Sequence, residues 1–214
     1  MHIEVLVEDA SGKRLLEALL PKLIGEQGQP HTWRIIGFKG VGRLPRDLHG
    51  RTHARDRILL DQLPRLFQGY GQTPGIDAVL VVLDSDRRDC ADFLSELKAL
   101  AARCQGARHT MFRLAIEEIE AWYLGDREAL LTAYPRAKKK VLDRYRQDSV
   151  CGTWELLADA IYPGGSVGLK KAGWPLPGQV KCEWAERIGV LLEPSRNVSP
   201  SFQKLWEGLR RMTG

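Results

Sequence analysis

The chain has 214 residues, of which 43% are hydrophobic and 28% are charged, a composition typical of a globular protein with a sizeable core. No apolar stretch approaches the roughly 18 residues that a membrane span needs, and the acidic N-terminus does not resemble a signal peptide, so we expect a cytoplasmic protein with no membrane partner. The formal net charge of +5 permits an anionic partner such as nucleic acid without requiring one.

Strand and helix patterns alternate over residues 1–125. The apolar runs at 3–8, 31–38, 76–84 and 109–116 predict strands. Helical spacing follows the first run, and further helices are predicted at 53–67, at 90–104 and in EEIEAWYLG. This alternation predicts an α/β core built on a mostly parallel sheet flanked by helices.

The strand signal disappears from Asp126 onward. RAKKKVLDRYR, TWELLADAIY, KCEWAERIGVLL and SPSFQKLWEGLRRM have helical patterns, and the segment YPGGSVGLKKAGWPLPG, rich in glycine and proline, is predicted to be a connection. Ser199 before Pro200 is a candidate N-cap with proline at the first helical position. Residues 126–214 are therefore predicted to form a helical C-terminal region packed on the core.

Three of the predicted strands end in acidic residues: Glu8, then Asp84 and Asp86, then Glu117, Glu118 and Glu120. In an open parallel sheet the carboxyl ends of the strands form the rim where ligands bind. If the backbone stays extended, Asp84 and Asp86 point the same way, and their oxygens suit Mg²⁺ or Mn²⁺. The alternative is that these acids only favour the N-termini of the helices that follow, as we expect for Asp9.

The order of these motifs resembles the Toprim domain of primases, topoisomerases and OLD-type nucleases. LVEDASGKRLL, LVVLDSDRRDC, RLAIEEIEAWYLGD and the tail KCEWAERIGVLL…NVSPSFQKLW together resemble a bacterial Toprim-like family of unknown function. That family is often encoded near an ATPase and is suspected in phage defence, and the resemblance covers nearly the whole chain. Glycine usually follows the Toprim glutamate, whereas Asp9 follows Glu8 here.

The resemblance implies a role for each acidic residue at the rim. Glu8 resembles the Toprim glutamate that serves as acid/base or metal ligand, and Asp84 and Asp86 match the metal-binding DxD. Glu120, with Glu118 second, lies in the acidic EIEAW segment and is implied to complete a metal position. Glu8, Asp84, Asp86 and Glu120 are thus the catalytic candidates, with Mg²⁺ or Mn²⁺ as cofactor. We expect both aspartates to be ionised at neutral pH, since the usual pKa is about 3.9 and a cation lowers it.

Positive charge is concentrated between residues 39 and 57 of the sequence. This segment is expected to contact the phosphates of a nucleic acid, in a salt-dependent way, beside the acidic rim. The candidate nucleic-acid-binding residues are Lys39, Arg43, Arg46, Arg51 and Arg55. A solvated loop is the alternative.

The leading functional hypothesis is a Mg²⁺- or Mn²⁺-dependent endonuclease that cleaves DNA or RNA, as the effector of a phage-defence system with an ATPase subunit. One alternative is a non-catalytic regulatory or sensor subunit that binds an ATPase. Another is a transferase that uses DxD to hold a metal–nucleotide. A topoisomerase or primase is disfavoured, because 214 residues leave no room for DNA-gate domains and no zinc-binding module is present.

Overall fold

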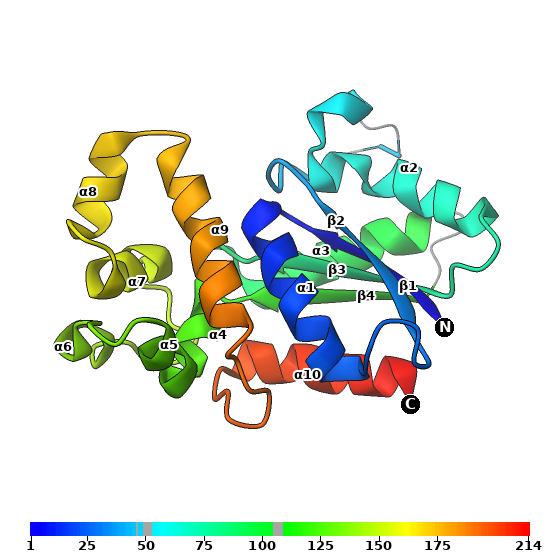
Figure 1. Ribbon diagram of the computed structural model, residues 1–214. Coiled ribbons are helices and arrows are strands. Elements are labelled where there is room, and N and C mark those ends of the chain that lie inside the picture. Colours follow the sequence, from blue (N-terminus) through cyan, green and yellow to red (C-terminus); the bar gives the residue numbers. More distant parts are fainter. Residues whose placement is uncertain (46, 49–52, 105–108) are drawn as a thin grey trace.

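The structure is a computed structural model, and it describes residues 1–45, 47–48, 53–104 and 109–214. Its centre is a sheet with the strand order β2-β1-β3-β4, in which all three pairings are parallel (Figure 1). The strands are β1 (His2–Val7), β2 (Thr32–Gly37), β3 (Ala78–Asp84) and β4 (His109–Ala115). The predicted α/β class and parallel sheet are confirmed.

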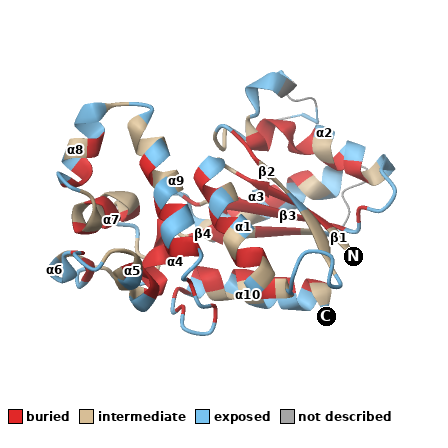
Figure 2. Cartoon of the chain, viewed as in Figure 1, coloured by how far each residue is buried: buried red, intermediate tan, exposed pale blue. Residues whose placement is uncertain are grey.

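Helices cover both faces of the sheet. The first face carries α1 (Ala10–Ile24), and the second carries α2 (Leu59–Gln72) and α3 (Cys90–Arg103), with the short η1 (Ala54–Asp56) before α2 (Figure 1). Along β3, Leu80 and Val82 join the core cluster on the first face, whereas Val81 and Leu83 join the one on the second. Burial on both sides explains why β3 is a continuous apolar run rather than an alternating one (Figure 2).

The C-terminal region consists of helices. They are α4 (Glu120–Gly125), α5 (Arg127–Ala133), α6 (Lys139–Leu142), α7 (Thr153–Ile161), α8 (Gly165–Ala172), α9 (Leu176–Gly189) and α10 (Pro200–Thr213). Helices α9 and α10 pack on the first face beside α1, while α5 to α8 lie beyond the carboxyl ends of the strands (Figure 1). Among the described residues, no helix has the length and apolarity to cross a membrane.

Two local predictions for this region differ from the structure. Helix α8 lies inside the segment that was predicted to be a connection, and RAKKKVLDRYR contains only the single turn of α6. Leu169 of α8 is fully buried, and the side chain of Asp159 accepts a hydrogen bond from the N–H of Ser166 at 2.7 Å. Packing and this cap therefore stabilise a helix that its glycines disfavour. The N-cap at Ser199 is confirmed by its hydrogen bond from the N–H of Phe202.

Asp126 connects two parts of the C-terminal region. Its buried carboxylate accepts hydrogen bonds from the backbone N–H groups of Ala129 at 3.1 Å and Glu193 at 2.9 Å, and from the guanidinium of Arg196 at 2.8 and 3.0 Å. Burial opposes its charge, but Arg196 and the two backbone donors outweigh that effect and lower the pKa of Asp126.

We expect Asp126→Ala to lower the free energy of unfolding by about 3 kcal/mol at neutral pH, because it removes a buried carboxylate and leaves two backbone N–H donors and the more exposed Arg196 without their acceptor. The pKa of Asp126 is depressed by folding, so its contribution is present above the unfolded pKa of about 3.9 and is lost as the pH falls through the folded value. The measurement is urea unfolding at neutral pH and at about pH 3. The difference in free energy of unfolding between wild type and variant should be smaller in acid. A pH-independent difference would contradict this account.

Candidate active site at the carboxyl ends of the strands

Asp84 and Asp86 lie where β3 ends. Asp84 is the last residue of β3 and pairs with Ala115 of β4. Asp86 has a φ of 50°, in the left-handed region, and its N–H donates to the carbonyl of Glu117 at 2.9 Å. The backbone therefore does not stay extended, so the condition for both side chains to point the same way is not met. Asp84 is half-buried, whereas the Asp86 side chain is 53% exposed and pairs with Arg88 at 3.5 Å.

Glu8 follows β1, the neighbour of β3 in the sheet. Its side chain is half-buried, and its Oε2 is buried with no hydrogen-bond partner among the described residues. Burial, together with the charges of Asp86 and Asp9, raises the pKa of Glu8 to about 7. Asp9 itself is the N-cap of α1 and accepts a hydrogen bond from the N–H of Gly12 at 2.7 Å, which confirms its expected capping role.

Glu117, the first acid after β4, has a structural role. Its carboxylate accepts hydrogen bonds from the backbone N–H groups of Cys151, Gly152 and Thr153, each at 2.9 Å. Burial opposes its charge, but the hydrogen bonds from Thr153 and the backbone outweigh it and lower the pKa of Glu117. Glu117 therefore stabilises the N-terminus of α7, and its carboxylate oxygens are already used as hydrogen-bond acceptors there.

Glu118 and Glu120 extend the acidic rim. Glu120, the first residue of α4, is fully buried, and burial raises its pKa. Glu118 is half-buried, and its Oε2 accepts a hydrogen bond from the N–H of Trp154 at 3.0 Å. Burial raises the pKa of Glu118 to about 7, with the charge of Glu120 adding to the effect and a nearby lysine opposing it.

That lysine is Lys181 of α9, and its ammonium lies among these carboxylates. Its Nζ is 3.1 Å from Oε1 of Glu120 and 3.8 Å from Oε1 of Glu118, and its side chain is 19% exposed. Burial disfavours the charge, but Glu120, Glu118 and Asp84 outweigh burial and raise the pKa of Lys181. We refer to Glu8, Asp84, Glu118 and Glu120 as the acidic cluster, and Lys181 is its counter-charge.

The sequence interpretation did not include Lys181. The signal that identifies it is its spacing from Trp184, Ala185 and Ile188, which are all buried. These positions follow the pattern i, i+3, i+4 and i+7 of a core-facing helix stripe. A lysine at the start of such a stripe is buried against the protein and needs an acidic partner.

The pKa of Asp84 in the metal-free protein is shifted away from its usual value. Burial, followed by the charge of Glu8, raises the pKa of Asp84 well above the ordinary range. The expectation that Asp84 is ionised was made for a site with a bound cation, and it stays a prediction for that state. In the structure, Asp84 lies among other carboxylates, so their mutual repulsion opposes its charge when no cation is bound.

The acidic cluster has the oxygen donors that suit Mg²⁺ or Mn²⁺. Within the described ranges, no three His, Cys, Asp or Glu side chains lie close enough to hold a metal ion as they stand. However, Oε2 of Glu8 and Oε2 of Glu120 are buried without hydrogen-bond partners in the part of the chain that is described. Such oxygens are costly unless a cation or donor satisfies them, so the residues fit a hard divalent ion after side-chain adjustment.

A groove of about 920 Å³ opens beside Glu8. The loop after β2 forms one wall with Phe38 and Lys39, and α9 and the residues before it form the other. Trp174 lines this groove with 83% of its surface exposed. The groove therefore places an exposed indole and the carboxylate of Glu8 in one cavity.

The candidate phosphate-binding residues are distributed over several surfaces. Lys39 lines the groove beside Glu8, and Arg43 lines a smaller hollow of about 150 Å³ that also includes Arg88. Arg55 is 83% exposed and lies 4.0 Å from Asp56. Arg46 and Arg51 lie outside the described residues. Lys39 therefore shares a cavity with Glu8 of the acidic cluster, whereas Arg43 lines a different hollow.

Comparison with known proteins yields one assignment. Searches of curated proteins and of solved structures gave no match. A family model described as a domain of unknown function (DUF4276) matches residues 7–210, which is nearly the whole chain and includes every member of the acidic cluster and Lys181. The chain therefore belongs to the DUF4276 family.

Proposed function

We propose that this protein is a Toprim-type, Mg²⁺- or Mn²⁺-dependent endonuclease that hydrolyses phosphodiester bonds in DNA or RNA. The observation that carries the proposal is the contact of Lys181 with Glu120 and Glu118 at the rim where β1 leads into Glu8 and β3 ends in Asp84, whose charges oppose one another. Carboxylates whose burial and mutual repulsion raise their pKa values are enriched at catalytic and cation-binding sites.

Asp84 and Glu120 are the residues that would hold the metal, with Glu118 as a further ligand. Asp86 would join them if its side chain turned from Arg88 toward Asp84. A divalent ion held there would activate water and stabilise the leaving oxygen of a phosphodiester. Glu8 lines the groove, and its unpartnered Oε2 is available either as a proton acceptor or as another ligand. Lys181 supplies positive charge to the cluster in the absence of metal and positions Glu118 and Glu120.

The biological setting of the proposal comes from the Toprim resemblance. It comprises a cytoplasmic protein, a nucleic-acid substrate, and an ATPase subunit that controls the activity in phage defence. Lys39 and Arg43 are the described residues of the basic segment that would contact phosphate near the acidic rim.

A non-catalytic regulatory subunit that binds an ATPase is the second candidate. It is favoured by the ion pair of Lys181 with Glu120, because an ammonium that already neutralises the cluster can preserve a Toprim-like shape without a cation. The two candidates differ in one measurable property, which is divalent-ion-dependent turnover.

The direct test is cleavage of single-stranded and double-stranded DNA and RNA with Mg²⁺ or Mn²⁺, with and without an ATPase encoded nearby. We expect wild type to cleave at least one substrate and Glu8→Gln to be slower by at least about 100-fold, the scale of a lost acid/base group. Glu17→Gln, which alters only an exposed i,i+4 pair with Lys13, is the matched control and should retain activity. Equal rates for wild type and Glu8→Gln, or no cleavage by wild type in any condition, would favour the regulatory subunit.

A further inference from the structure

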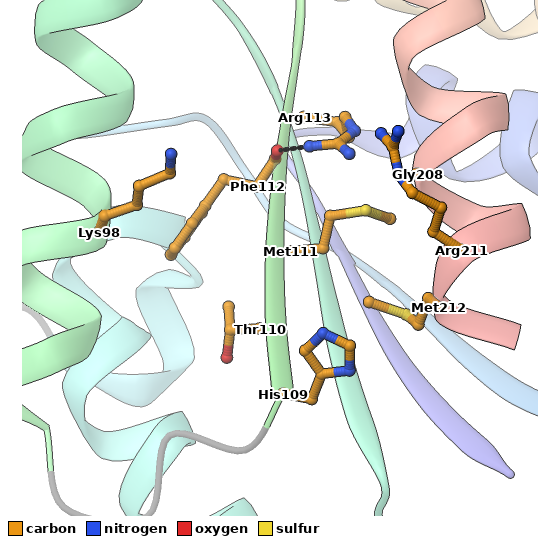
Figure 3. Close-up of a pocket in the computed structure, with 9 residues that line it drawn as sticks. All are labelled: Lys98, His109, Thr110, Met111, Phe112, Arg113, Gly208, Arg211 and Met212. Atoms are coloured by element: carbon orange, nitrogen blue, oxygen red, sulfur yellow. Dashed lines mark hydrogen bonds between the residues drawn. The ribbon is translucent and has the colours of Figure 1, made fainter.

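The free edge of β4 carries two adjoining pockets away from the groove beside Glu8. β4 is the last strand of the sheet, with α3 packed toward one face and α10 toward the other. The pockets have volumes of about 240 and 290 Å³ and share Phe112, Arg113 and Arg211. Figure 3 shows the first pocket, in which the guanidinium groups of Arg113 and Arg211 lie at one end and the imidazole of His109 at the other.

The ionisable residues around this edge are almost all basic. The two pockets are lined by Lys98, His109, Arg113, Lys204 and Arg211. No Asp or Glu of the described chain forms an ion pair with any of these five within 4.0 Å. Asp148 also lines the second pocket, but its carboxylate accepts hydrogen bonds from Ser199 Oγ at 2.8 Å and the N–H of Ser201 at 2.6 Å. The edge therefore has an excess of unpaired positive charge.

Arg113 is held in place but is not neutralised. Its Nε donates to the carbonyl of Lys204 at 2.9 Å and its Nη1 to the carbonyl of Phe112 at 2.8 Å. These two bonds orient the guanidinium. They use only some of the N–H donors that a guanidinium has, so the others can bind a ligand. Burial and the charge of Arg211 lower the pKa of Arg113, and the charge of Glu207 acts in the opposite direction.

Gly208 of α10 makes room for this guanidinium. A Cβ at Gly208 would collide with Nη2 of Arg113 and would lie 2.6 Å from Sδ of Met111. Glycine inside a helix costs about 1 kcal/mol relative to alanine. The absence of a side chain at Gly208 therefore allows a half-buried arginine to sit between β4 and α10 without a carboxylate partner.

We propose that this pocket on the β4 edge binds a backbone phosphate of a nucleic acid. Two neighbouring guanidinium groups match the oxygens of a phosphate and are repelled by one another in its absence. The pocket's position also suits this ligand, because Arg113 is two residues before Ala115, the partner of Asp84. That separation is about 7 Å along the strand, and the second pocket continues to Ile116 beside the acidic rim.

This inference rests on the proposed function for the identity of the ligand, but its test does not require cleavage. The binding of labelled DNA and RNA oligonucleotides is measured by fluorescence anisotropy with EDTA present, over a range of salt concentrations. We expect Arg113→Gln/Arg211→Gln to weaken binding by at least tenfold and to reduce the slope of log K against log salt by about one, since the two arginines contact one phosphate and each phosphate contact contributes roughly one unit. Thermal unfolding verifies that the variant is folded.

Two further variants complete the test. Gly208→Ala keeps both arginines but displaces the Arg113 side chain, and it should weaken binding as well. Lys140→Gln/Lys171→Gln removes the same charge from exposed sites on α6 and α8 and should bind as wild type does. Equal oligonucleotide binding by the arginine double variant and this control would overturn the proposal. The proposal would also fail if the arginine double variant lost binding of inorganic phosphate but bound oligonucleotides as wild type does. Binding without cleavage in any condition would contradict the nuclease and leave this site standing.

Discussion

Asp84→Asn is expected to reduce metal-dependent cleavage by about 1,000-fold or more while the protein remains folded. A bound metal provides several kcal/mol of transition-state stabilisation, and a loss of about 4 kcal/mol corresponds to three orders of magnitude. Asparagine retains the shape of Asp84 but cannot supply the same charge to a cation. Because burial and the charge of Glu8 oppose ionisation of Asp84, the metal-free variant should be at least as stable as wild type.

The measurement is single-turnover cleavage, combined with calorimetry of Mg²⁺ and Mn²⁺ binding. Asp89→Asn is the matched control, because it removes the same charge from the loop that follows β3 and asparagine caps α3 about as well as aspartate does. Retained cleavage and cation binding in Asp84→Asn would assign the acidic rim a structural role. A similar loss in both variants would point to a general effect of charge instead.

Lys181→Met is expected to lower the free energy of unfolding by about 3–5 kcal/mol without divalent ions, because it leaves buried carboxylates with no counter-charge. Glu120 is the most affected residue, since its side chain is only 1% exposed and its ion pair with Lys181 is lost. If the acidic cluster is the cation site, Mg²⁺ should restore part of this loss by taking over the role of the ammonium.

Urea unfolding with and without Mg²⁺ provides the measurement. Lys13→Met removes an exposed lysine that pairs with Glu17 at 3.7 Å, and it should change stability by less than about 1 kcal/mol. Equal stabilisation of wild type and Lys181→Met by Mg²⁺ would place the cation away from Lys181. No loss of stability in Lys181→Met would show that the cluster is neutral without the lysine.

The sequence alone was sufficient for the sheet and for the position of the acids. β3 is a continuous apolar run, because a central parallel strand is buried on both faces, and such a run is visible without a structure. β1 and β4 are apolar runs that Glu4 and Arg113 interrupt, and the apolar residues around these two positions still mark them as strands. The residue at which an apolar run ends can also be read from the sequence, so Glu8 and Asp84 could be predicted to lie at one rim of the sheet. It could not separate Glu117 from Glu118, because the partners of Glu117 come from residues 151–153.

The tertiary structure decided what surrounds those acids. The partner of Glu120 is Lys181, some 60 positions later in the chain, and the glycine that seats Arg113 lies on α10, far from β4 in sequence. The left-handed turn at Asp86 likewise depends on a hydrogen bond to the carbonyl of Glu117. Periodicity reports which face of an element is buried, but charge pairing and pocket shape depend on which elements the fold brings together, so these features were decided only by packing between distant segments.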